Sequence, residues 1–173
     1  MENEQDLVNQ NQTAIEEYFD IVKSEYDNER NKKQSFENRA GLLLALIAAF
    51  CAFILENVKI VEVLSLMNST VVFFGGIKII SGVVVYIGIA VTLINIFKVI
   101  NVKKHDNFEV KDINEVLLVE PRIIALCKII FTYRDIIIQH RTLNEERAKN
   151  FRNAVYGVSV MMLFTVLYLA IPC

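Results

Sequence analysis

The sequence contains few residues that interrupt an α-helix. It has 2 prolines and 6 glycines among 173 residues, and a proline inside a helix costs about 3 kcal/mol. No proline or glycine precedes Gly41, and none lies between Pro121 and Gly157. The sequence therefore predicts two long helices. One runs from about Thr13 past Gly41, and the other runs for about 50 residues from Pro121, which suits a first helical turn.

Residues that serve catalysis, metal binding or disulfide bonding are also scarce. The 2 histidines, His105 and His140, belong to no catalytic or zinc motif, and the GxSxG, HExxH and P-loop patterns are absent. The 3 cysteines lack the spacing of metal ligands, and their odd number disfavours a disulfide framework. We therefore expect a protein that is not an enzyme, has no metal or built-in cofactor, and does not bind a nucleic acid duplex.

Charge is missing from three stretches, although 22% of all residues are charged. These stretches are residues 40–55, 79–97 and 154–173. A transmembrane helix needs about 20 predominantly apolar residues, and a soluble fold would have little polar surface left to cover three such helices. The sequence therefore predicts an all-α membrane protein with transmembrane helices at about 40–56, 76–98 and 154–172.

The distribution of lysine and arginine predicts how the chain crosses the bilayer. Basic residues precede the first and third spans and follow the second, whereas only Lys59 and Lys78 lie between the first two spans. Because basic loops stay in the cytoplasm, the N-terminus is expected inside and the C-terminus outside. The predicted parts are a cytoplasmic amphipathic helix (1–39), a transmembrane hairpin with a short outer loop (40–100), a cytoplasmic helical segment (101–153) and a last transmembrane helix (154–173).

The uncharged stretch 63–77 leaves a second topology open. Its insertion as a separate span would place Lys98 outside, against the distribution of the other basic residues. We expect instead that the end of this stretch extends the second helix outward, and that Lys78 snorkels toward the lipid head groups.

Small and polar residues in the spans predict helix contacts. In the first span a small residue recurs every four positions, and such a ridge lets two helix backbones approach closely in lipid. Packing within the chain and contact between chains, which would give a homo-oligomer, both remain open. Polar Ser81, Thr92 and Asn95 fit an ion pathway or, as we favour, interhelical hydrogen bonds. The predicted packing residues are Gly41, Ala45, Ala49, Gly82 and Gly88.

Arginines and tyrosines in the cytoplasmic helices form a candidate ligand site. Arginine and aromatic groups suit a phosphorylated ligand that carries a base. The alternative is contact with anionic lipid at about 1 kcal/mol per basic residue. We favour lipid for Lys149 and Arg152, which lie next to the third span. The predicted ligand-binding residues are Lys33, Arg39, Arg134, Arg141, Arg147, Tyr26, Tyr133 and Asn144.

Two segments at the membrane entrances carry a family resemblance. They are YDNERNKKQSFENRAGLLLALIAAF (26–50) and YRDIIIQHRTLNEERAKNF (133–151). Their order resembles the SLATT-like and related few-span membrane effectors of bacterial antiphage systems of the CBASS and Pycsar type, whose members usually have two spans. The resemblance implies an inner-membrane protein whose cytoplasmic helices bind a cyclic nucleotide or oligonucleotide from a neighbouring enzyme. It also implies a pore or membrane disruption that halts the infected cell, as in abortive infection.

Two other functions remain compatible with the sequence. One is a constitutive membrane scaffold or accessory subunit, in which the spans only anchor the cytoplasmic helices. The other is a small oligomeric channel that needs no ligand. The resemblance also leaves open whether the ligand would activate the protein or restrain it.

Overall fold

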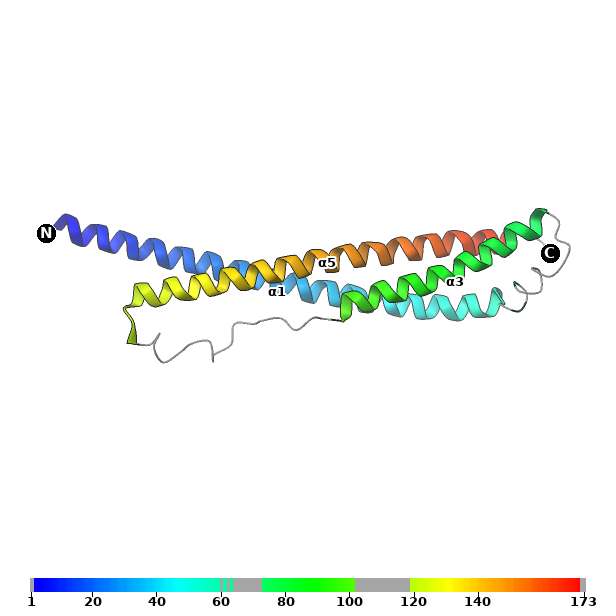
Figure 1. Cartoon of the computed structure of the whole chain (residues 1–173), viewed down its shortest axis with the longest axis horizontal. Coiled ribbons are helices and arrows are strands. Elements are labelled where there is room, and N and C mark those ends of the chain that lie inside the picture. Colours follow the sequence, from blue (N-terminus) through cyan, green and yellow to red (C-terminus); the bar gives the residue numbers. More distant parts are fainter. Residues whose placement is uncertain (1, 60, 62, 64–72, 102–118, 172–173) are drawn as a thin grey trace. The chain divides into compact units, whose positions relative to one another are not determined.

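The computed structural model describes residues 2–59, 61, 63, 73–101 and 119–171, and the long elements in these ranges are helices (Figure 1). They are α1 (Glu2–Asn57), α3 (Phe73–Ile100) and α5 (Arg122–Ala170). With 56 residues, α1 has a length of about 84 Å at 1.5 Å per residue. With 49 residues, α5 has a length of about 74 Å. The predicted long helices that continue into the first and third spans are confirmed.

The start of α5 differs slightly from the expectation. The backbone amide of Ala125 donates a hydrogen bond to the carbonyl of Pro121 at 3.1 Å. A residue whose carbonyl accepts the first helical bond occupies the N-cap position, so Pro121 precedes the first turn rather than lying in it.

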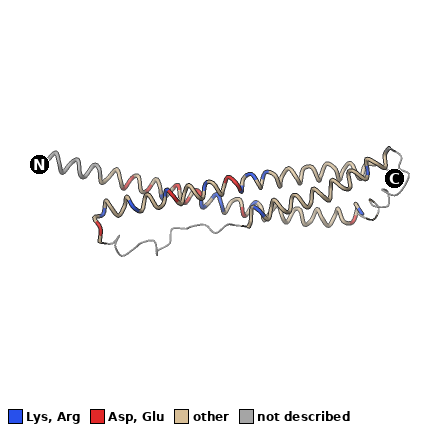
Figure 2. The backbone as a smooth tube through the Cα atoms, viewed as in Figure 1, with Lys and Arg blue, Asp and Glu red and all other residues tan. Residues whose placement is uncertain are grey.

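All three helices are long and apolar enough to cross a membrane. Figure 2 shows charged residues along the first part of α1 and of α5, and few charged residues along α3 and the later parts of the other two helices. The predicted all-α fold with three spans is therefore confirmed, and the chain is a multi-pass membrane protein. The part of the stretch 63–77 that decides the alternative topology lies largely outside the described residues.

The helices form two compact units. The polar unit comprises Met1–Ser35 and Lys103–Glu145, and the apolar unit comprises Phe36–Val102 and Glu146–Cys173. Helices α1 and α5 contribute to both units, whereas α3 belongs to the apolar unit alone.

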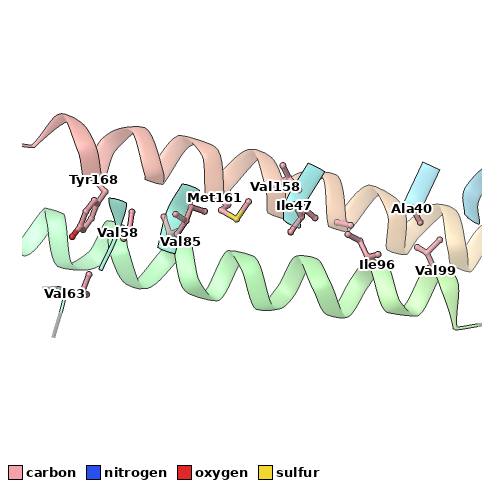
Figure 3. Close-up of a cluster of buried hydrophobic side chains, with 12 residues drawn as sticks. Ala40, Ile47, Val58, Val63, Val85, Ile96, Val99, Val158, Met161 and Tyr168 are labelled. Atoms are coloured by element: carbon pink, nitrogen blue, oxygen red, sulfur yellow. The ribbon is translucent and has the colours of Figure 1, made fainter. Parts of the chain in front are cut away.

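In the apolar unit, side chains from all three helices form one hydrophobic core (Figure 3). On α5 the buried positions from Ala154 through Thr165 to Tyr168 follow one another in steps of four and three, which is the spacing that keeps one side of a helix facing its neighbour. On α1, Ala40, Ile47 and Ile54 recur every seven residues and therefore also lie on one side. The core residues on α5 are Ala154, Val158, Met161 and Tyr168.

Glycines allow α3 to approach α5 closely. A Cβ atom on Gly88 would lie 3.2 Å from Met161 Cβ and 3.8 Å from the carbonyl oxygen of Gly157. A Cβ atom on Gly157 would overlap Thr92 Oγ1. Lipid provides no hydrophobic drive between helices, and small residues at such crossings allow the close packing that holds the helices together instead. Gly82 lies at a third contact of this kind, against Val63 and Tyr168.

Candidate functional site

In the polar unit, α1 and α5 run parallel and contact each other along one interface, which we call the seam. Tyr26 contacts the ring of Tyr133 at 5.1 Å and that of His140 at 5.7 Å between ring centroids. One turn further along both helices, Glu29 bonds with Asn144. Contacts that advance in the same direction on both helices mean that the helices are parallel. The seam therefore combines an aromatic layer with a polar layer.

Glu29 is the most buried charged residue of this seam, with 1% of its surface exposed. Asn144 Nδ2 donates to the Glu29 carboxylate and to the Glu29 backbone carbonyl, both at 2.9 Å. Lys32 Nζ donates to the other carboxylate oxygen at 2.8 Å. A buried carboxylate needs such donors because an unpaired charge in the interior is costly.

The surroundings of Glu29 keep it ionised. Burial raises the pKa of its carboxyl group, but hydrogen bonds from Lys32 and Asn144 and the positive charges of Lys32 and Arg141 outweigh that effect. The pKa of Glu29 therefore lies below its ordinary value. Burial also raises the pKa of Tyr133, with smaller contributions from Tyr26 and Asp27, so this phenol stays neutral.

Arg141 lies at the outer edge of the seam and is already paired with carboxylates of its own chain. Its guanidinium NH2 group lies 2.7 Å from Glu25 Oε1, and its Nε lies 3.7 Å from Glu29 Oε1. The pair with Glu25 is partly exposed, so its contribution is of the order of 1 kcal/mol or less. We call Tyr26, Glu29, Tyr133, His140, Arg141 and Asn144 the seam cluster.

The structure brings together four of the eight predicted ligand-binding residues: Tyr26, Tyr133, Arg141 and Asn144. Arg134 is exposed instead, 5.2 Å above the ring of Phe131. Lys33 is half-buried in the polar unit.

Arg39 and Arg147 belong to the apolar unit rather than to the polar unit. Arg39 is exposed, whereas Arg147 is buried. Burial lowers the pKa of Arg147, and the charges of Glu37 and Glu146 oppose that effect. Burial outweighs these charges, so the pKa of Arg147 lies below its ordinary value.

Sequence reasoning missed Glu25, Glu29 and His140 as parts of this site. Spacing was the available signal. Glu29 follows Tyr26 by three residues, and His140 follows Tyr133 by seven, so both lie on the buried side of their helices. A carboxylate at such a position needs a polar partner on the facing helix.

The small-residue ridge of the first span faces away from α3 and α5. Gly41, Ala45 and Ala49 are all exposed, and a Cβ atom on Gly41 would meet nothing within 4 Å. Packing within the chain therefore uses the opposite side of α1, which carries Ile47 and Ile54.

Two of the three polar residues expected to form interhelical hydrogen bonds, Thr92 and Asn95, bond within their own helix instead. Thr92 Oγ1 donates to the Gly88 carbonyl of its own helix at 2.7 Å, and Asn95 Nδ2 donates to the Val91 carbonyl at 2.8 Å. A hydroxyl can satisfy itself in this way because the carbonyl one turn earlier points toward it.

Lys78, which the sequence predicts to snorkel toward head groups, is buried in the apolar unit, with its ammonium group at the end of α5. Its Nζ lies 3.4 Å from the carbonyl oxygen of Ile171 and 5.0 Å from the ring centre of Tyr168. The last carbonyls of a helix lack helical donors and carry the negative end of its dipole, so an ammonium group is favoured there.

Comparisons with known proteins assign no family to the chain. No family model matches the chain, and no match was found among curated proteins or solved structures. Within the described residues, no group of three histidine, cysteine or acidic side chains is placed to hold a metal ion. The seam cluster is therefore interpreted from its own contacts.

Proposed function

We propose that this protein is a membrane effector of a bacterial antiphage system, controlled at its polar unit by a cyclic nucleotide or oligonucleotide. The observation that carries the proposal is the continuity of α1 and α5. Neither helix breaks where the polar unit gives way to the apolar unit, at Ser35 and Glu145. A rotation or separation of these two helices in the polar unit is therefore transmitted directly into two spans.

The apolar unit itself supports action through rearrangement or assembly. Its core is filled by side chains such as Val85, Ile96 and Met161, all fully buried. The buried hydroxyls of Thr92 and Thr165 bond to carbonyls of their own helices. A packed apolar core favours a membrane breach formed between chains, or after the helices repack, over a pathway through one chain.

The seam cluster supports a ligand that competes with carboxylates. A phosphate group would bind Arg141 and the amide of Asn144 in place of Glu25 and Glu29. The rings of Tyr26 and Tyr133 would then be available to stack on a base. Such a ligand stabilises an opened seam only through its higher affinity for that state. The resemblance of the two membrane-entrance segments supplies the choice of a cyclic nucleotide.

A constitutive scaffold is the second candidate, and one observation favours it. Arg141, the arginine of the seam cluster, is already paired with Glu25 and Glu29. A cluster that satisfies itself needs no ligand. In this alternative the polar layer only fixes the register of α1 against α5, a role that buried polar residues have in coiled coils.

Dye release from proteoliposomes that contain the purified protein tests the proposal. Cyclic mononucleotides and cyclic di- and trinucleotides are added separately, and we expect one of them to start or stop release. The variant Arg141→Glu should lose this response and still insert, whereas Arg30→Glu, at another exposed arginine of the polar unit, should retain it. Steady release under every condition indicates a ligand-independent channel, and no release under any condition indicates a scaffold.

A further inference from the structure

One side of the polar unit exposes large apolar side chains without a covering helix among the described residues. The ion pair between Arg141 and Glu25 marks this side. Tyr18 and Ile21 precede Glu25 by seven and four residues, so they lie on the same stripe of α1. Phe131 and Ile138 precede Arg141 by ten and three residues and lie on the matching stripe of α5. We call these residues the lateral face: Tyr18, Ile21, Phe131 and Ile138.

The exposure of the lateral face is unusual for a polar part of a protein. Ile21 is 64% exposed and Ile138 is 56% exposed, and both lie outside the predicted spans. In the apolar unit, α3 packs against the other two helices, whereas the described part of the polar unit contains only α1 and α5. Exposed apolar residues gathered on one side of a polar unit, beside charged ones, are typical of a protein interaction site.

Charge identifies the occupant of this face. On the α1 side of this face, Glu25 lies on the stripe and Glu17 precedes Ile21 by four residues. On the α5 side, Arg134 and Arg141 follow Phe131 and Ile138 by three residues each. Within one chain the pair of Arg141 with Glu25 at 2.7 Å already joins an acidic α1 residue to a basic α5 residue at this face. A second copy that places its α5 beside this α1 would meet the same complementarity, whereas α1 against α1 would repel.

The membrane restricts how two copies meet. Helices α1 and α5 are parallel within the polar unit, and both continue into spans. Two copies in one bilayer therefore have the same orientation, and a twofold axis between them runs along the membrane normal. Each lateral face then meets its own equivalent, which is the self-complementary arrangement that such an axis requires.

We infer that the lateral face binds the lateral face of a second copy of this chain. The product is a parallel four-helix bundle in which α1 and α5 alternate, so that each acidic helix lies between two basic helices. The apolar residues of both faces form its core. This inference does not require a ligand and holds for the effector and for the scaffold alike.

The mass of the full-length protein in lipid nanodiscs, measured by mass photometry or native mass spectrometry, tests the inference. We expect the parent to be a dimer, or a larger assembly with an even number of chains. The variant Ile138→Glu puts a charge into the lateral face and should shift self-association by at least tenfold toward the monomer. Gln139→Glu adds the same charge at the exposed neighbouring position, off the stripe, and should keep the parent mass.

Helical content by circular dichroism shows whether each variant remains folded. A monomeric parent, or equal masses for Ile138→Glu and Gln139→Glu, would overturn the inference. A second measurement uses cysteine crosslinking between differently tagged copies in which Cys51, Cys127 and Cys173 are replaced by serine. Ile21→Cys on one copy should crosslink to Ile138→Cys on the other. More efficient crosslinking between two Ile21→Cys copies would exclude the alternating arrangement.

Discussion

Replacing Asn144 by alanine should open the seam of the polar unit without changing its surface. Asn144 provides one hydrogen bond to the Glu29 carboxylate and one to the Glu29 backbone carbonyl. A hydrogen bond to a charged group contributes about 1.5–3 kcal/mol, and a neutral one about 0.5–1.5 kcal/mol. Glu29 keeps Lys32 as a partner, so we expect a total loss of about 2–4 kcal/mol.

Hydrogen exchange measured by mass spectrometry reports this loss where it occurs. A destabilisation of about 2–4 kcal/mol corresponds to exchange that is roughly 30- to 700-fold faster, because about 1.4 kcal/mol is a factor of ten. The effect should appear in the peptides of α1 around Glu29 and of α5 around Asn144. Peptides of α3, which does not contribute to the polar unit, should exchange at the parent rate.

Gln139→Ala is the matched control for Asn144→Ala. It removes an exposed amide side chain from the same helix, five residues before Asn144, and should leave the exchange rates within about twofold. Equal exchange around Glu29 in the two variants would show that the Asn144 bonds contribute little, and the polar layer would then have no role in holding α1 against α5.

Three further predictions concern acid, packing and topology. Because the pKa of Glu29 is lowered in the folded protein, ionised Glu29 stabilises the folded state above its unfolded pKa of about 4.3, and this stabilisation is lost as the pH falls through the lower pKa of the folded state. As the pH is lowered through this range, hydrogen exchange around Glu29 should accelerate in the parent but much less in Glu29→Gln. Gly157→Ala should lower the free energy of unfolding by about 1–3 kcal/mol because its new Cβ overlaps Thr92 Oγ1, whereas Gly41→Ala should be neutral or slightly stabilising. Thermal unfolding of the two variants in detergent checks this difference. In a variant with no other cysteine, a membrane-impermeant thiol reagent should label Cys173 from outside the cell, and labelling only from the cytosolic side would reverse the topology.

The sequence was sufficient to predict the helices and the spans because both depend on local patterns. The scarcity of proline and glycine predicted the unbroken α1, and the missing charges at 79–97 predicted the core of α3. Such signals do not require knowledge of any partner helix. They give the length and polarity of an element and leave its neighbours undefined.

Which residues form the seam cluster depends on how α1 pairs with α5, so the sequence predicted only some of them. Arg141 and Asn144 were selected as groups that bind an anion, but their partners are acidic residues on α1 more than a hundred positions earlier. Only the register of α1 against α5 brings them together. The predicted residue Arg147 was separated from the cluster for the same reason, because it lies among the residues of the other unit.

The parallel seam also has a consequence for synthesis. Asn144 is made 115 residues after Glu29, and a ribosome adds about 5–20 residues per second. For roughly 6 to 23 seconds the carboxylate of Glu29 has no Asn144 to bind, and α1 has left the ribosome before its partner exists. The contacts between α1 and α5 in the polar unit therefore form only after α3 and the first part of α5 have been synthesised.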